Sequence, residues 1–173
     1  MNVNEKDKYC KTPIEYALIL GIFLLGFTGV CRYLLTRGAV LDKDIHKEYL
    51  FKSAEQGKLE VLKFLIENGF DINCKDEQGE TPIFKAISSK CFGVTKFLFE
   101  HNASLGIINK YGESLEMLIN KCEHQLIRNY FFNRLGVGGP NQSVSQSIEL
   151  KTDEYSSKSV DQKGNKKEAK ITK

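Results

Sequence analysis

The sequence of 173 residues is poor in the residues that mark several protein classes. Three prolines and 14 glycines exclude a collagen-like or proline-rich polymer. A mean hydropathy of −0.33 excludes a protein with several membrane spans. The five cysteines are odd in number and form no Cys-x-x-Cys pair, which argues against both a disulfide framework and a zinc site. We therefore expect them to be small apolar residues in a reducing compartment.

Outside the C-terminal segment, positive and negative charges nearly balance. The net charge is +3, and residues 158–173 alone carry six lysines against Asp161 and Glu168, a local balance of +4. The rest of the chain therefore balances at −1. Because no broad basic field is left, we expect no nucleic acid partner.

Motifs for catalysis are missing as well. The sequence contains no nucleophile beside a base and no paired carboxylates at a recognisable spacing. The glycine-rich residues 136–139 lack the Lys-Ser/Thr of a phosphate-binding loop. We predict a non-catalytic protein with no catalytic residue, no cofactor and no bound metal. A hydrolase that uses one of the cysteines is the remaining alternative.

The sequence does contain an internal repeat with a period of 33 residues. Residues 57–69 (GKLEVLKFLIENG) are echoed by residues 90–102 (KCFGVTKFLFEHN), and both segments space their apolar positions as one helical stripe. Between them, Gly79 marks a tight turn, and Thr81 is expected to accept a hydrogen bond from a free N–H group of the next helix. A fixed period over helical stripes predicts stacked helix pairs.

These motifs make the chain resemble the ankyrin-repeat proteins. Residues 76–83 read Asp-Glu-Gln-Gly-Glu-Thr-Pro-Ile where the family reads Asp-x-x-Gly-x-Thr-Pro-Leu, and residues 57–61 match its Gly-x-Leu-Glu-Val second helix. The resemblance runs from about residue 12 to residue 132. It implies an all-α solenoid of helix-turn-helix units joined by β-hairpin-like loops. We place the ankyrin-repeat domain at residues 8–135, with repeats at about 12–42, 46–75, 79–108 and 112–135.

Three of the four repeats depart from the family pattern. The first holds about five extra residues between its helices, because residues 12–38 span 26 positions where residues 81–102 span 21. The second has Glu-Tyr at residues 48–49 in place of Thr-Pro, so we expect its first helix to lack the usual cap. The fourth has Ser-Leu at residues 114–115 and is degenerate. We expect its polar residues to face solvent on a terminal cap; they are Glu123, Gln125, Arg128 and Asn129.

Residues 16–31 form an apolar run of 16 residues without a charge. A membrane-spanning helix needs about 20 residues, and a signal peptide fits poorly because acidic and basic residues alternate before the run. We predict two buried helices joined through residues 21–29; the alternative is that the run anchors the module to a membrane or docks it there. The insertion leaves apolar residues at an end of the stack without a preceding repeat, where we expect contact with a partner, a second copy or a membrane. They are Ile22, Phe23, Leu24, Leu25 and Phe27.

Residues 136–173 are rich in lysine and serine, and Tyr155 is their only aromatic residue. Such a segment cannot bury enough apolar area to offset the entropy lost on ordering, so we predict a disordered tail. Its lysines are expected to aid solubility. A localisation signal or a weak contact with phosphate or anionic lipid is the alternative.

The resemblance implies recognition of another protein by a concave surface of hairpin tips and first helices. The sequence does not name this partner. We expect a monomer in the cytoplasm of the producing cell, or of a host cell if the protein is delivered there as an effector. Tyr111 is the best candidate for an anchor, because tyrosine buries a large area with few torsions. The partner-binding residues, carried over by position, are Glu55, Gln56, Lys75, Glu77, Gln78, Glu80, Ser88, Ser89, Ile108, Lys110, Tyr111 and Glu113.

Overall fold

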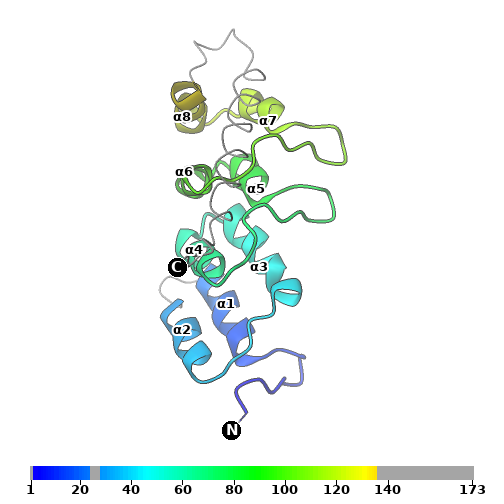
Figure 1. Ribbon diagram of the computed structural model, residues 1–173, viewed down its shortest axis with the longest axis vertical. Helices are drawn as coiled ribbons and strands as arrows, with labels where there is room; N and C mark the ends of the chain where they lie inside the picture. The colour runs from blue at the N-terminus through cyan, green and yellow to red at the C-terminus, as the bar shows by residue number, and fades with distance from the viewer. Residues whose placement is uncertain (1, 24–27, 136–173) are drawn as a thin grey trace, which may run out of the picture.

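Helices follow one another in pairs along the part of the chain that the structure describes, residues 2–23 and 28–135 of a computed structural model (Figure 1). Helices α1, α3, α5 and α7 form one layer, and α2, α4, α6 and α8 form the other. The predicted all-α solenoid is confirmed. The helices are α1 (Pro13–Phe23), α2 (Thr28–Thr36), α3 (Lys43–Glu55), α4 (Leu59–Glu67), α5 (Pro82–Ser88), α6 (Phe92–Glu100), α7 (Leu115–Lys121) and α8 (Gln125–Leu135).

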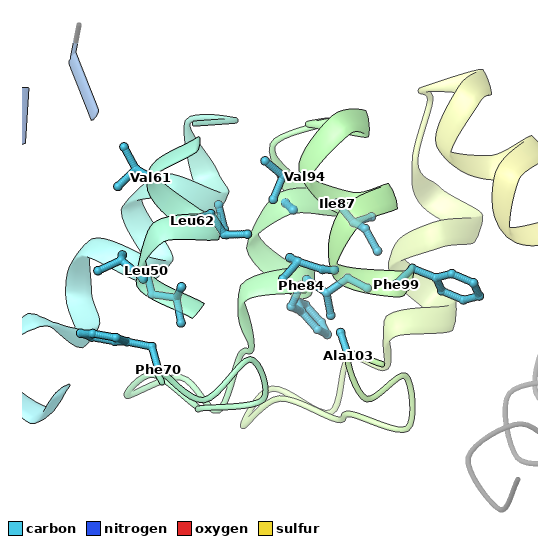
Figure 2. Close-up of a cluster of buried hydrophobic side chains, with 14 of the residues drawn as sticks. Leu50, Val61, Leu62, Phe70, Phe84, Ile87, Val94, Phe99 and Ala103 are labelled. Carbon is cyan, nitrogen blue, oxygen red and sulfur yellow. The ribbon is translucent and has the colours of Figure 1, made fainter. Parts of the chain in front are cut away.

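One continuous apolar core runs between the two layers. The stripes predicted from the sequence supply it, since Leu62 and Leu65 of α4 and Leu98 of α6 are all fully buried. Figure 2 shows how Leu62 and Phe84, from successive repeats, contribute to the same cluster. Truncating one such leucine to alanine costs about 2–5 kcal/mol, so the stack depends on contacts between repeats.

The second repeat starts its first helix earlier than the sequence pattern suggested. Helix α3 has 13 residues where α5 has seven, and it begins at Lys43. The Asp42 side chain accepts hydrogen bonds from the N–H groups of Asp44 and Ile45, both at 2.9 Å. The usual Thr-Pro cap is absent, as expected, but Asp42 provides another cap upstream of that position.

The insertion in the first repeat mainly lengthens α1, which has 11 residues against seven in α5. The prediction of two buried helices is confirmed for α1, where Ile22 is only 2% exposed, but was wrong for α2, in which Cys31 alone is buried. The expectation that Ile22 lies uncovered was wrong, because the added helical turn carries it into the core. Phe23 is 66% exposed, as expected, whereas residues 24–27 lie outside the described part. Among the helices described, none is both long and apolar enough to cross a bilayer.

The expected cap at Thr81 was also wrong. The Thr81 side chain is fully buried and its hydroxyl has no hydrogen-bond partner. At the matching position of α1, Thr12 and Glu15 bond reciprocally, with Thr12 N donating to Glu15 Oε2 at 2.8 Å and Glu15 N donating to Thr12 Oγ1 at 3.4 Å. Position 84 is Phe84, whose side chain has no group that can complete such a capping box.

The last repeat of the stack exposes polar side chains together with two apolar ones, Met117 (51%) and Leu126 (57%). Glu123, Gln125 and Asn129 are exposed, as expected for a terminal cap. Arg128 is half-buried instead, because its guanidinium lies 6.0 Å from the centre of the Phe132 ring. The tail that was predicted to be disordered, residues 136–173, lies outside the described residues.

Candidate functional surface

The loop before α5 projects from the stack and is held by one aspartate (Figure 1). Asp76 Oδ1 accepts hydrogen bonds from Gln78 N at 2.9 Å and from Glu80 N at 2.8 Å. The backbone closes the same tip, with Asp76 N donating to the Glu80 carbonyl at 3.0 Å. Gly79 lies between them at a φ of +79°, in the left-handed region that favours glycine. The tip is therefore fixed by its own hydrogen bonds.

The loop before α7 repeats this geometry with an asparagine. Asn109 Oδ1 accepts from Tyr111 N at 3.0 Å and from Glu113 N at 2.9 Å, and Gly112 has a φ of +77°. Ile108 and Ser114 form an isolated antiparallel bridge at its base. These contacts account for the predicted hairpin-like loops.

The first tip along the chain has the same geometry; it lies at the N-terminal end of the stack and was missed in the sequence. Asp7 Oδ1 accepts from Tyr9 N at 2.9 Å and from Lys11 N at 3.0 Å. The signal was present, since residues 7–13 read Asp-Lys-Tyr-Cys-Lys-Thr-Pro with the spacing of residues 76–82. Cys10 stands where glycine is expected, at a φ of +58°, and this substitution concealed the motif.

The second repeat has the start of α3 in place of such a tip. Residues 43–48 form the extra helical turns on the same side of the stack as the hairpins (Figure 1). Ile45 is 59% exposed there, while His46 packs inward. We refer to the three tips and this helical segment together as the finger row; it comprises residues 5–11, 43–48, 75–80 and 108–113.

Hydrogen bonds between neighbouring tips make part of the finger row one unit. Asn109 Nδ2 donates to Glu80 Oε1 at 3.1 Å and to Glu113 Oε2 at 3.2 Å. Lys110 N donates to the Gln78 carbonyl at 2.8 Å. The spacing between the tips before α5 and α7 is therefore fixed as well as their individual shapes.

Lys85 of α5 anchors the tip before α5 to the helix layer. Its ammonium lies 2.9 Å from Asp76 Oδ2 and 2.6 Å from Glu80 Oε2. Burial opposes ionisation of Asp76, but bonds from Lys85 and from backbone N–H groups outweigh it and hold the pKa of Asp76 below its ordinary value. The carboxylates of Asp76 and Glu80 therefore both have an ion-pair partner within the protein.

The structure divides the twelve residues proposed from the sequence into two groups. The eight at residues 75–80 and 108–113 lie on the finger row, where Tyr111 is 73% and Ile108 is 62% exposed. The other four lie at the C-terminal ends of α3 and α5, which rise about 20 Å and about 10 Å from their starts. Among the tip residues, Gln78, Glu80 and Glu113 are half-buried. The four distant residues are exposed; they are Glu55, Gln56, Ser88 and Ser89.

Known proteins resemble the stack in sequence. A family model described as ankyrin repeats (many copies) matches residues 50–99. A protein of Rickettsia bellii that is named as an ankyrin repeat protein is 32% identical over 124 residues, which cover 66% of this chain and 74% of that relative. The chain belongs to the ankyrin-repeat family. An ankyrin-repeat domain is a protein-interaction module.

Longer ankyrin-repeat proteins are also similar. Two fowlpox virus proteins named as ankyrin repeat proteins are 26% identical over 110 residues and 33% identical over 72 residues. These alignments cover 64% and 42% of this chain. The chain spans only 25% and 17% of the length of these two relatives.

The cysteines of the ankyrin stack differ widely in their surroundings. Burial raises the pKa of both Cys31 and Cys74 to about 11, so these thiols stay protonated near neutral pH. Cys10 is exposed at the first tip. Within residues 2–23 and 28–135, no group of three or more His, Cys, Asp or Glu side chains is placed to hold a metal ion.

Proposed function

We propose that this ankyrin-repeat protein binds a partner protein without catalysing a reaction, and that the finger row and the adjoining first helices form the binding surface. The observation that carries the proposal is the fixed tip of the fourth repeat. Asn109 holds the backbone on both sides of the turn while the Tyr111 side chain stays 73% exposed. A preorganised tip loses little entropy on binding, so more of its contact energy becomes affinity.

Tyr111 is the proposed anchor of this surface, and Ile108 adds apolar area beside it. Glu77, Lys75 and Lys110 are exposed and available for polar contacts. Glu80 and Glu113 have partners within the stack, so we assign them a role in holding the tips. The four residues at the helix ends would extend the contact toward a larger partner; they are Glu55, Gln56, Ser88 and Ser89.

The test is affinity capture of a partner by the full chain, followed by titration of that purified partner against Tyr111→Ala. Loss of a central tyrosine anchor costs about 2 kcal/mol or more, so we expect a Kd about 30-fold higher. Tyr33→Ala is the matched control, because Tyr33 of α2 is 60% exposed on the other layer. An unchanged Kd for Tyr111→Ala, or an equal loss for both variants, would refute the anchor.

We propose that the protein acts as a cytoplasmic monomer, in the producing cell or in a host cell that receives it. Gln125 and Asn129 of α8 are exposed polar residues that disfavour head-to-tail stacking, and they flank the exposed Leu126 (57%). Light scattering during size-exclusion chromatography would test the mass. A mass twice that of the chain would contradict a monomer.

Docking on a membrane is the second candidate, and an apolar stripe on α1 supports it. Tyr16, Leu20 and Phe23 follow the helical spacing of one face, with 38%, 38% and 66% of their surface exposed. If this stripe binds lipid, the protein should sediment with vesicles and Phe23→Asp should release it. A carbonate-resistant pellet that depends on residues 16–31 would instead indicate an anchor. A protein that stays in the supernatant in both assays would eliminate this candidate.

A further inference from the structure

We propose that the finger row recognises an extended acidic segment of a partner protein that also carries apolar side chains. This inference rests on the proposed function, because it specifies the partner of the same surface. It also gives a role in binding to the first tip and the start of α3, which belong to the finger row but hold none of the twelve residues proposed from the sequence.

Six of the seven lysines of the finger row form no ion pair with any described residue, whereas Lys11 pairs with Glu15 at 3.2 Å. Elsewhere in the stack, surface cations commonly have a partner, as in Arg32 with Glu67 at 2.6 Å and Lys90 with Glu123 at 2.9 Å. An ammonium without a partner can bind an incoming carboxylate without first losing one within the protein. The unpaired lysines of the row are Lys6, Lys8, Lys43, Lys47, Lys75 and Lys110.

Most carboxylates of the row are already engaged. Asp76 and Glu80 bind Lys85, and Glu113 lies 3.6 Å from Lys121. Tyr16 Oη donates to the carboxylate of Asp7 at 2.6 Å, and the same bond helps to lower the pKa of Asp7. The six unpaired lysines therefore outnumber the exposed carboxylates without an ion pair, which are Glu5, Asp44, Glu77 and Asp7, the last bound by the Tyr16 hydroxyl.

Apolar anchors accompany these lysines along the row. Tyr9 and Tyr111 occupy the same position of the first and last tips, and each follows a lysine. Tyr9 is 64% exposed, and Lys8 Nζ lies 4.9 Å from the centre of its ring. Ile45 of α3 is 59% exposed, and α3 lies between α1 and α7 along the stack (Figure 1). An aromatic residue beside a cation offers both buried area and charge to an acidic segment.

The row has the length of a short linear segment. Packed helices lie about 8–10 Å apart, so three repeats separate Tyr9 from Tyr111 by about 25–30 Å. An extended chain covers about 3.3 Å per residue, so about eight or nine residues span both tips. Nucleic acid fits less well, because it carries a phosphate charge at every nucleotide, whereas a peptide segment can place neutral or apolar residues beside Glu5, Asp44 and Glu77.

The experiment is selection of a displayed library of short random peptides on the full chain, followed by titration of the best synthetic peptide. We expect an acidic pool that contains aromatic or aliphatic residues. Lys8→Glu/Lys110→Glu should raise the Kd of the peptide about tenfold or more, and about 0.5 M salt should weaken binding to the parent. Lys58→Glu/Lys96→Glu, away from the tips, makes the same charge change as a control and should have little effect. Circular dichroism verifies that both variants fold.

Enrichment of neutral or basic peptides, or of no peptide, would refute the proposal that the partner segment is acidic. An equal loss in both charge variants would overturn its placement on the finger row. If Tyr111→Ala weakens the peptide while Lys8→Glu/Lys110→Glu does not, the proposed function stands and this inference fails. If an oligothymidine strand binds as tightly as the peptide and loses affinity in the same charge variant, the partner is a nucleic acid and the inference is wrong.

Discussion

Replacing Asn109 with aspartate should destabilise the protein, although aspartate occupies the matching position of two other tips. Asp7 faces the hydroxyl of Tyr16 and Asp76 faces the ammonium of Lys85. Asn109 instead donates from its amide to Glu80 and Glu113 at 3.1 and 3.2 Å. A carboxylate at this position loses both hydrogen bonds and lies against two like charges.

The magnitude follows from these contacts. Two lost hydrogen bonds cost about 1 kcal/mol each, and the repulsion adds about 1 kcal/mol after screening by water and Lys85. We expect Asn109→Asp to lower the free energy of unfolding by about 2–3 kcal/mol near neutral pH, or the urea midpoint by about 1–2 M. The deficit relative to the parent should shrink below about pH 4, where the new carboxyl is protonated and can donate a hydrogen bond.

Urea unfolding followed by circular dichroism, at neutral and acidic pH, is the assay. Asn109→Ala loses the same bonds without adding charge, so its deficit should change less with pH. Asp76→Asn is the reciprocal variant: its amide oxygen still accepts the two backbone bonds, but its NH2 group faces the Lys85 ammonium, so we expect a cost of about 1–2 kcal/mol from the lost ion pair. A parent-like midpoint for Asn109→Asp at neutral pH would refute the role assigned to the amide.

Three further predictions concern the helix caps, the stability of the protein in acid and the reactivity of its cysteine thiols. Thr81→Val should leave stability equal or higher because it removes an unpaired buried hydroxyl, whereas Thr12→Val should cost about 1–2 kcal/mol in thermal unfolding. The pKa values of Asp76 and Glu15 lie below their ordinary 3.8 and 4.5, so the stability they contribute is present above those values and lost as pH falls through the lowered pKa values. Unfolding at a series of pH values should show this loss, and a flat profile between about pH 5 and 2 would contradict it. Cys10 should react with a thiol reagent far faster than Cys31, which is 1% exposed, and equal rates would show that the first repeat opens freely.

The sequence was sufficient for the stacked helix pairs because their signal is local and periodic. Residues 57–69 and 90–102 repeat their apolar positions at a fixed period, and those positions form the core. The first tip was missed because Cys10 replaces the expected glycine while the surrounding residues keep the motif. The start of α3 was missed because the helix continues upstream of Glu48-Tyr49, and Asp42 caps it where the repeat pattern calls for a hairpin.

The candidate surface was less predictable, because its contacts join residues of different repeats. Glu80 and Asn109 are 29 residues apart in the chain and meet only when the repeats stack. Position within the repeat correctly placed Tyr111 and Ile108 on exposed surface. It could not indicate that Glu80 and Glu113 hold the tips, since their partners depend on the distance between neighbouring loops.

Hydrogen–deuterium exchange of the full chain, alone and saturated with its captured partner, tests the central claim most directly. The account predicts slower exchange in the bound state at the tips, residues 7–11, 76–80 and 109–113, and at the start of α3. The amides of α2 and α6 should exchange as they do in the free protein. Protection confined to α2, α4, α6 and α8, with unchanged tips, would contradict the account.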